Sequence, residues 1–236
     1  MQEVRRIHPR IGGKKLYWML KADLHHLQGA TGRDKFFDIL GRNKLLVKRR
    51  KKYVKTTESW HYFHKYTNKL KDKLLTGANQ AYASDITYLR TRKGFVYLFL
   101  QTDVYSRMIT GWHLSDSLSI EGAIRALKMT LRQCGGKTEG IIHHSDRGIQ
   151  YCCKEYVKVM KERKMQISMT EENHCYENAM AERVNGILKQ EYLLDETFAD
   201  KASALQAVKQ AICSYNNHRP HWSLNLLTPR QVHMVA

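Results

Sequence analysis

Apolar side chains follow two different spacings along the 236 residues of this chain. In residues 1–77 they recur every three or four positions, which is typical of short amphipathic helices. Glycines at positions 12–13, 29, 32 and 41 separate these runs and favour turns between the helices. From residue 81 the apolar residues are β-branched or aromatic and lie in short extended runs, a pattern typical of strands. The chain therefore changes from a helical region to one that begins with a sheet.

The extended runs and the helical runs after residue 81 follow a definite order. Three strands are predicted at residues 82–89, 95–102 and 108–114, with short connections that favour antiparallel pairing. They are followed by a helix at 119–133, a strand at 140–144, a helix at 154–164 and a strand at 166–169. This order predicts an α/β fold with a mixed five-stranded sheet flanked by helices, as in ribonuclease-H-like folds.

The rest of the chain is predicted to be helical at first and then extended. Residues 170–178 are polar and without periodicity, so we expect a loop there that becomes ordered when ligands bind. Helices are predicted from about 179 to 194 and from 201 to 216. The last twenty residues, with Pro220 and Pro229, are expected to form an extended tail.

Charge divides the chain in the same way as the apolar spacing. The formal net charge is +18, and residues 1–77 hold 20 basic and 6 acidic residues, against 20 and 16 in residues 78–236. Such an excess is typical of proteins that bind a polyanion, with double-stranded DNA as the first candidate. We expect residues 1–77 to form a small basic helical DNA-binding region and linker, and residues 78–236 to form a catalytic core with a C-terminal helix and tail.

The densest positive run closes the basic region. It consists of Lys48, Arg49, Arg50, Lys51 and Lys52. So many like charges cannot pack in a core, so the run is either a solvated helix end or a contact with the DNA backbone. The charge of the whole region favours the DNA contact.

The five cysteines give information on the cellular compartment. They are odd in number, form no C-x-x-C pair and lack zinc-ligand spacing, although Cys152 and Cys153 are adjacent. Neither a signal peptide nor an apolar run long enough to cross a membrane is visible. The sequence predicts a soluble protein of the reducing cytoplasm.

Three acidic residues stand out by their context. Asp85 lies within an apolar strand, Asp146 follows a strand directly, and Glu182 lies about one turn into a helix. A carboxylate in an apolar strand needs a cation or a hydrogen-bond donor, and open α/β sheets place ligand groups just after their strands. Converging carboxylates in a basic protein are the ligands that two divalent cations need for phosphoryl transfer.

Two other acids compete with this set. A hairpin closed by residues 91 and 94 would pair Asp85 near Leu100 and Asp103 near Tyr82, and would turn Asp103 to the opposite face. A connection one residue longer or shorter would instead put Asp103 on the same face as Asp85. Glu177 competes with Glu182 but lies in the predicted loop.

Five short motifs then occur in a fixed order. They are Ser-Asp-Ile-Thr-Tyr at 84–88, Thr-Asp-Val-Tyr-Ser-Arg at 102–107, His-Ser-Asp-Arg-Gly-Ile-Gln-Tyr at 144–151, Asn-Ala-Met-Ala-Glu at 178–182, and Tyr-Asn-Asn-His-Arg-Pro-His-Trp at 215–222. Asp146 and Glu182 have 35 residues between them. Over about residues 68–232 the chain resembles the DDE recombinases, which include retroviral integrases, and in particular the OrfB-type transposases of the insertion sequence three family.

This resemblance implies a fold, an activity and a set of site residues. The fold would be ribonuclease-H-like, and the activity would be nicking at element ends followed by attack of the freed 3′-OH on another phosphodiester. Asp85, Asp146 and Glu182 would be the catalytic and metal-binding triad, holding two Mg²⁺ or Mn²⁺ ions. The enzyme would act in a prokaryotic cell, associated with the nucleoid, as a homo-oligomer, with an upstream OrfA-type partner. Residues 1–77 match the family's helix-turn-helix segment only loosely.

Further residues are candidates for DNA contacts. Arg183 and Lys189 flank the active-site part of the predicted helix, and His218 and Arg219 lie in the last motif. Each of them is explained equally well as an ordinary surface residue. In the same motif we expect Tyr215 and Trp222 to pack on the core and His221 to lie nearer the DNA. His143, His144, Asn178 and Asn185 either orient substrate or form structural hydrogen bonds.

Two alternative functions remain at this point. A retroviral-type integrase is disfavoured, because the amino-terminal His-His-Cys-Cys zinc module of that group is absent. A catalytically inactive or domesticated DNA-binding protein derived from a transposase is the second alternative. The intact set of three acids argues against it.

Overall fold

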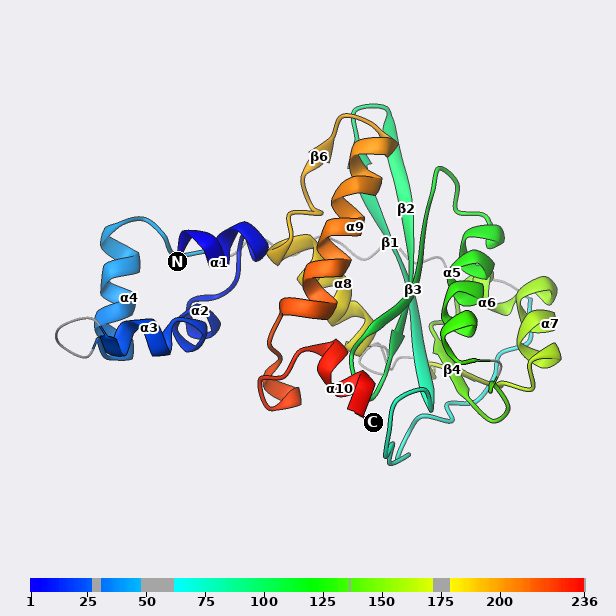
Figure 1. The fold of residues 1–236 in the computed structure, drawn as a ribbon. Coiled ribbons are helices and arrows are strands. Elements are labelled where there is room, and N and C mark those ends of the chain that lie inside the picture. The colour runs from blue at the N-terminus through cyan, green and yellow to red at the C-terminus, as the bar shows by residue number, and fades with distance from the viewer. Residues whose placement is uncertain (27–30, 48–61, 136, 172–178, 236) are drawn as a thin grey trace.

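The computed structural model describes residues 1–26, 31–47, 62–135, 137–171 and 179–235 (Figure 1). The basic run at 48–52, the rival Glu177, Asn178 and most of the predicted loop at 170–178 lie outside these residues. None of the helices in the described ranges is long and apolar enough to cross a membrane.

The amino-terminal region is helical, as its apolar spacing predicts. It contains α1 (Gln2–Ile7), α2 (Gly13–Met19), α3 (Lys21–His26) and α4 (Arg33–Arg42). These helices enclose a small apolar cluster of their own, formed by Ile11, Leu16, Leu20, Phe36 and Leu40. We call residues 1–47 the helical unit, and Figure 1 shows it beside the carboxyl end of α8.

A mixed sheet forms the centre of the rest of the chain. Its strands are β1 (Ala81–Thr91), β2 (Gly94–Asp103), β3 (Ile109–Ser115), β4 (Ile142–Ser145) and β5 (Gln166–Met169). Their spatial order is β3-β2-β1-β4-β5, and the two-residue strand β6 (Thr197–Phe198) adds to β1. The predicted mixed five-stranded sheet is confirmed, and β6 is an addition that its two residues were too few to indicate.

The first hairpin has the register that the sequence predicts. Thr91 pairs with Gly94 across the turn, and Gly94 has a φ of +119°, a conformation that glycine adopts without strain. Asp85 pairs with Leu100 as a consequence, and Asp103 pairs with Tyr82. The two aspartates are therefore three pairs apart along the hairpin, and they point to opposite faces of the sheet.

Helices cover both faces of the sheet (Figure 1). α5 (Ile120–Gln133), α6 (Ile149–Cys152) and α7 (Lys154–Glu162) lie on one face, while α8 (Ala179–Glu191) and α9 (Lys201–His218) lie on the other. Successive side chains of β2 point to opposite faces of the sheet and contribute to the apolar core on each face. Leu98 and Leu100 pack toward α8 and α9, whereas Phe99 packs toward α5. Gly122 lets α5 approach closely, since a Cβ there would lie 2.3 Å from the Phe99 ring.

The C-terminal end differs from its prediction. Instead of an extended tail, the chain forms a short 3-10 helix, η2 (Trp222–Leu224), and then α10 (Pro229–Val235). Pro229 is the first residue of α10, a position where its missing N–H is not needed. The prediction of extended structure was wrong because proline was taken only as a helix breaker.

Candidate active site

Parallel pairing of β1 with β4 places Asp85 beside Asp146. β1 and β4 pair in parallel, and their last pair is Ala83 with His144. Asp85 and Asp146 each come two residues later in the same direction, so both continue the same face at the same level. Both side chains are partly buried. The two carboxylates therefore lie side by side just beyond the last β1–β4 pair, with Asp85 inside β1 and Asp146 directly after β4.

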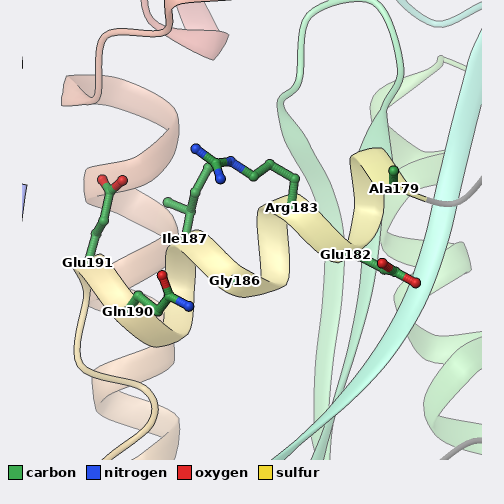
Figure 2. A pocket seen from close by; sticks show the side chains of 7 residues that line it. All are labelled: Ala179, Glu182, Arg183, Gly186, Ile187, Gln190 and Glu191. Atoms are coloured by element: carbon green, nitrogen blue, oxygen red, sulfur yellow. The ribbon is translucent and has the colours of Figure 1, made fainter. Parts of the chain in front are cut away.

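The first half of α8 brings a third carboxylate to this point. The Asn185 side chain donates a hydrogen bond of 2.6 Å from Nδ2 to Oδ2 of Asp85, which holds the helix against β1. Glu182 lies three residues earlier, hence on a neighbouring part of the same helix surface. Figure 2 shows its carboxylate directed toward the strands, away from the far end of the helix. Glu182 is exposed.

The negative charges of Asp146 and Glu182 both act on Asp85. Burial, followed by the negative charge of Asp146 and to a smaller extent that of Glu182, raises the pKa of Asp85 to about 7. The hydrogen bonds from Asn185 and from the Ile86 backbone N–H act in the opposite direction. A cation bound between these carboxylates would offset the repulsion between their like charges.

Two residues that sequence reasoning missed shape the surroundings of Asp146. The backbone N–H of Gly148 donates to Oδ1 of Asp146 over 3.0 Å, and a Cβ at Gly148 would lie 2.9 Å from that same oxygen. Tyr151 is fully buried, and burial together with Tyr156, Asp146 and Asp85 raises its pKa well above the usual range. The Asp-Arg-Gly sequence was the available signal for the first of these, since glycine beside a ligand aspartate permits a close backbone approach.

The donors fit a hard divalent cation. Three carboxylates from β1, from the end of β4 and from α8 are the oxygen ligands that Mg²⁺ and Mn²⁺ prefer. The Oδ1 atom of Asn185 is buried and has no hydrogen-bond partner within the described residues, so it is a further oxygen acceptor beside Asp85. In the conformation described, however, no three His, Cys, Asp or Glu side chains of the described ranges are close enough together to hold an ion.

One predicted DNA-contacting residue lies next to the acids. The Nζ atom of Lys189 lies 4.4 Å from the centre of the Tyr88 ring, and the negative charge of Asp85 acts on it. Burial nevertheless lowers the pKa of Lys189. Two other candidates are exposed, namely Arg183 on α8 and His218 at the end of α9.

The structure contradicts the predicted DNA contact of Arg219. Its side chain is 1% exposed and donates two hydrogen bonds to Glu191, of 2.8 Å from Nε and 2.7 Å from Nη2. Nη1 lies 3.0 Å from His221, which is also buried rather than near a DNA surface. Tyr215 packs in the core as predicted, but Trp222 is 55% exposed and does not. Arg219 is thus part of the fold, because its guanidinium is already occupied.

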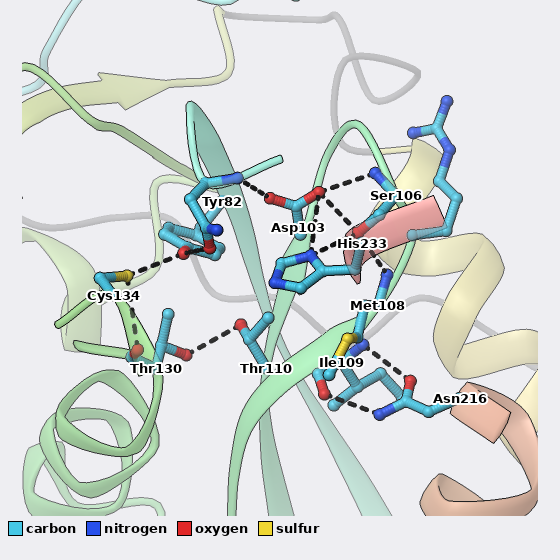
Figure 3. A network of polar contacts seen from close by, with 12 residues as sticks. Tyr82, Asp103, Ser106, Met108, Ile109, Thr110, Thr130, Cys134, Asn216 and His233 are labelled. Atoms are coloured by element: carbon cyan, nitrogen blue, oxygen red, sulfur yellow. Dashed lines mark hydrogen bonds and ion pairs between the residues drawn. The ribbon is translucent and has the colours of Figure 1, made fainter. Parts of the chain in front are cut away.

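Asp103, the rival first ligand, has a different role. It is fully buried and accepts hydrogen bonds of 2.7 Å from the backbone N–H groups of Asn79 and Ser106 and from the Ser106 hydroxyl. Figure 3 shows these contacts together with His233 of α10, whose Nδ1 lies 2.9 Å from the Ser106 hydroxyl. Asp103 therefore stabilises the turn after β2 and the docking of α10.

The two histidines before Asp146 are structural. His143 is fully buried, and its Nε2 is shared between the hydroxyls of Ser84 and Tyr156, at 2.6 and 2.8 Å. Burial lowers the pKa of His143 to about 3, so the ring is neutral. His144 is hydrogen-bonded to Ser168. These contacts hold β4 against the neighbouring strands and α7, and they favour a structural role for both histidines.

Comparisons with known proteins show the family of this chain. Two family models, both described as integrase core domain, match residues 76–175 and 163–229. The chain is 32% identical over 201 residues to the insertion element IS600 uncharacterized 31 kDa protein of Shigella sonnei, covering 84% of this chain and 74% of that protein. It is 36% identical over 161 residues to transposase InsF for insertion sequence IS3A of Escherichia coli, covering 68% of this chain. That match spans only 56% of the InsF transposase.

Solved structures of integrases share the fold. The catalytic core domain of HTLV-2 integrase in complex with magnesium superposes with a TM-score of 0.54 at 19% identity, covering 67% of this chain and 98% of that one. The integrase of a simian T-cell lymphotropic virus intasome gives a TM-score of 0.57 at 16% identity and covers 94% of this chain and 74% of its own. At these identities the likeness concerns the fold alone.

Proposed function

This chain belongs to the integrase-core transposases of the insertion sequence IS3 type, and from that membership we propose that it cuts and joins DNA strands with Asp85, Asp146 and Glu182 as its metal-binding acids. The substrates would be the ends of its insertion element and a target DNA. The net charge of +18 supports a polyanionic partner of this kind.

One observation supports the site assignment more than any other. The hydrogen bond between Asn185 and Asp85 holds the turn of α8 that contains Glu182 close to the point where Asp85 of β1 lies beside Asp146. This contact supports the proposed convergence of acids from three separate elements, although 35 residues separate Asp146 from Glu182 in the sequence. Bringing like charges together raises the free energy of the native state, so the stability of the fold does not explain this convergence.

Each residue of the candidate site has a separate proposed role at the reacting phosphodiester. Two Mg²⁺ or Mn²⁺ ions bound by the three carboxylates would neutralise phosphate charge and stabilise the attacking and leaving oxygens. Asn185 and the Gly148 N–H orient Asp85 and Asp146. Lys189, next to Asp85, places a positive charge where a phosphate oxygen would lie.

Two successive displacements at phosphorus account for transposition. In the first, a water oxygen bonds to phosphorus while the bond to the 3′ oxygen breaks, and that oxygen leaves as a 3′-hydroxyl after taking up a proton. In the second, the freed 3′-hydroxyl loses its proton, bonds to a phosphorus of the target strand and displaces another 3′ oxygen. Neither step changes the oxidation state of any atom, so no redox partner is needed.

Assembly and partners follow from the reaction. Two element ends must be cut together, so we propose a homo-oligomer that holds both ends, acting on DNA in the prokaryotic cytoplasm. An OrfA-type partner that supplies end recognition is part of the same proposal. The basic run at 48–52 and His218 remain proposed DNA contacts.

Cleavage of DNA that carries the ends of the element tests the proposal directly. Asp85→Asn, Asp146→Asn and Glu182→Gln keep side-chain shape but remove a ligand charge, so each should abolish Mg²⁺-dependent nicking and joining. Heat of Mg²⁺ binding, measured by calorimetry on each variant, should fall in parallel.

Asp116→Asn is the matched control, because Asp116 is exposed, lies beyond β3 and pairs only with Lys201 among the described residues. It should cleave like the unaltered protein. Cleavage within tenfold of wild type by any one of the three active-site variants would remove that residue from the triad. Full binding of DNA without any cleavage by the unaltered protein would favour an inactive DNA-binding protein instead.

A further inference from the structure

Four polar side chains form a closed hydrogen-bonded ring inside the core. They come from β1, β2, β4 and α7, and they are Ser84, Gln101, His143 and Tyr156. The Ser84 hydroxyl donates to Oε1 of Gln101 over 2.6 Å, and Nε2 of Gln101 donates to the Tyr156 hydroxyl over 3.1 Å. Nε2 of His143 closes the ring, 2.6 Å from the Ser84 hydroxyl and 2.8 Å from the Tyr156 hydroxyl. We call these four side chains the buried ring.

The buried ring lies behind the candidate active site and carries no charge. Each of its members is at most 1% exposed. Side chains alternate along β1, so Ser84 faces the core beneath α5 and α7, whereas Asp85 faces α8. Burial lowers the pKa of His143 to about 3 and raises that of Tyr156, so both are neutral. Any influence of the ring on the acids is therefore exerted through position and not through charge.

Stability alone does not explain the buried ring. The ring is not fully satisfied, because Nδ1 of His143 is buried and has no hydrogen-bond partner within the described residues. Apolar side chains of similar size would fill the same space without burying an unpaired polar atom. Hydrogen bonds add direction instead, since each one fixes how two elements lie against each other.

The strands that the ring joins are those that place the first two acids. Ser84 directly precedes Asp85, and His143 comes three residues before Asp146. β1 and β4 share only three residue pairs, whereas β1 and β2 pair along nearly the whole of β1. Parallel pairing is also slightly less stable per residue than antiparallel pairing. The contact between Ser84 and His143 crosses this short pairing, so it reinforces the register that puts Asp85 beside Asp146.

Aromatic packing extends the ring to the segment that follows Asp146. The side chain of Tyr151 on α6 is 2% exposed, and its ring centre lies 6.1 Å from that of His143 and 5.5 Å from that of Tyr156. Tyr151 comes five residues after Asp146. The chain is thus held by the same group of side chains on both sides of Asp146.

We propose that the buried ring positions Asp85 and Asp146 for metal binding by fixing the register of β1 against β4. Its four members are positioning residues, which act through the strands and do not contact the metal ions or the DNA. The proposal rests on the proposed function in taking the two aspartates as metal ligands. It adds that their separation depends on side chains on the opposite face of the sheet.

A variant with an apolar ring separates position from stability. It combines Ser84→Ala, Gln101→Met, His143→Phe and Tyr156→Phe, which remove all four hydrogen bonds and keep the core filled. The melting temperature should change by no more than about 4 °C, because both partners of each bond are replaced together. Mn²⁺ affinity, measured by calorimetry, and kcat for nicking of element-end DNA should each fall about tenfold. KM for the DNA should stay unchanged.

Tyr156→Phe alone is a milder variant with a matched control. Tyr215→Phe also removes one fully buried hydroxyl, which donates to the Arg107 carbonyl oxygen over 3.0 Å on the other face of the sheet. Both variants should lower the melting temperature by about 2–4 °C. Only Tyr156→Phe should weaken Mn²⁺ binding. Equal losses of Mn²⁺ affinity in the two variants would overturn the proposal, because general destabilisation would then explain them.

Hydrogen exchange tests the ring without metal or DNA. In EDTA, the amides of β4 should exchange about tenfold faster in the apolar-ring variant, while those of α9 on the other face should not change. Unchanged exchange in β4 would overturn the proposal, and so would faster exchange with unaltered Mn²⁺ affinity and cleavage. If the unaltered protein itself neither binds Mn²⁺ nor cleaves DNA, the proposed function fails. Faster exchange in β4 would even then support the ring as the group that sets the register of β1 and β4.

Discussion

Glu182 and Glu191 belong to one helix, α8, and lie nine residues apart, yet their surroundings are opposite. Both oxygens of Glu191 accept hydrogen bonds from the buried guanidinium of Arg219. Glu182 has no ion pair within the described residues, and its negative charge contributes to raising the pKa of Asp85. The fold satisfies one acid completely and leaves the other unsatisfied.

This difference distinguishes a structural acid from a functional one. A buried ion pair is retained because removal of either partner leaves an unpaired charge in a medium of low dielectric. A group of like charges has no such reason to persist in a folded chain unless a cation joins it. The surroundings of each glutamate, rather than its residue type, therefore indicate its role.

The same substitution at the two positions should have opposite consequences. Glu182→Gln should reduce strand cleavage by roughly 10²-fold or more, the cost of losing one electrostatic group at a reacting centre, while the unfolding free energy stays the same or rises. Cleavage of element-end DNA and urea unfolding measure the two quantities. Glu155→Gln, on exposed α7, is the control. A clear loss of stability with full activity would show that Glu182 is structural.

Glu191→Gln should do the reverse. The substitution removes the negative charge of Glu191 and leaves the Arg219 guanidinium buried without a counter-charge. The unfolding free energy should therefore fall by about 3 kcal/mol. Arg219→Lys should also destabilise the protein, since an ammonium cannot make the two parallel hydrogen bonds. Urea unfolding measures both. Unaltered stability in both variants would mean that the pair is not a structural anchor.

Lowering the pH should weaken the contact between the helical unit and α8. Burial, with the charges of His218 and Arg219, lowers the pKa of His8 to about 4 from its usual 6.5. The unfolded chain then binds the proton more strongly, so stability falls as pH decreases from about 6.5 toward 4, by at most about 1.4 kcal/mol per pH unit. Unfolding measured between pH 7 and pH 4 should show a smaller slope for His8→Gln. An identical slope would mean that His8 is not held neutral.

The smallest effect is expected for the exposed part of the same contact. Arg10 forms ion pairs of 2.9 Å with Glu196 and 3.5 Å with Asp195, and its side chain is 29% exposed. Arg10→Gln should therefore lower the unfolding free energy by about 0.5 kcal/mol, with a larger effect at low salt. Thermal unfolding at two salt concentrations measures this. A loss as large as that of Glu191→Gln would show that the ion pairs, rather than buried contacts, hold the helical unit.

The sequence was sufficient for much of the fold and for the identity of the acids. Side chains alternate between faces along a strand, and the turn at Gly94 sets the pairing, so the position of Asp85 relative to Asp103 follows from counting residues. The parallel strands were predictable from the helix between them. Asp85, Asp146 and Glu182 could be chosen because each stands at a recognisable point of a predicted element.

Other predictions needed distant partners that the sequence does not reveal. Arg219 was expected at the DNA because it follows a histidine in a polar, basic motif, but α9 brings it to Glu191, 28 residues earlier in the chain. Trp222 was expected in the core because of its size, yet its side chain lies on the surface in the short helix η2. Gly148 was part of a quoted motif but was given no role of its own.

The sequence by itself predicted the order of the five main strands and the helices between them, favoured the observed register of the first hairpin and named three acids as candidate metal ligands. These properties depend on local spacing, which any stretch of chain contains. Only the tertiary structure decided that Arg219 is buried and that Glu191 is paired with it. The free energy of a charge depends on every group within about 10 Å in space, and packing, not order along the chain, brings those groups together.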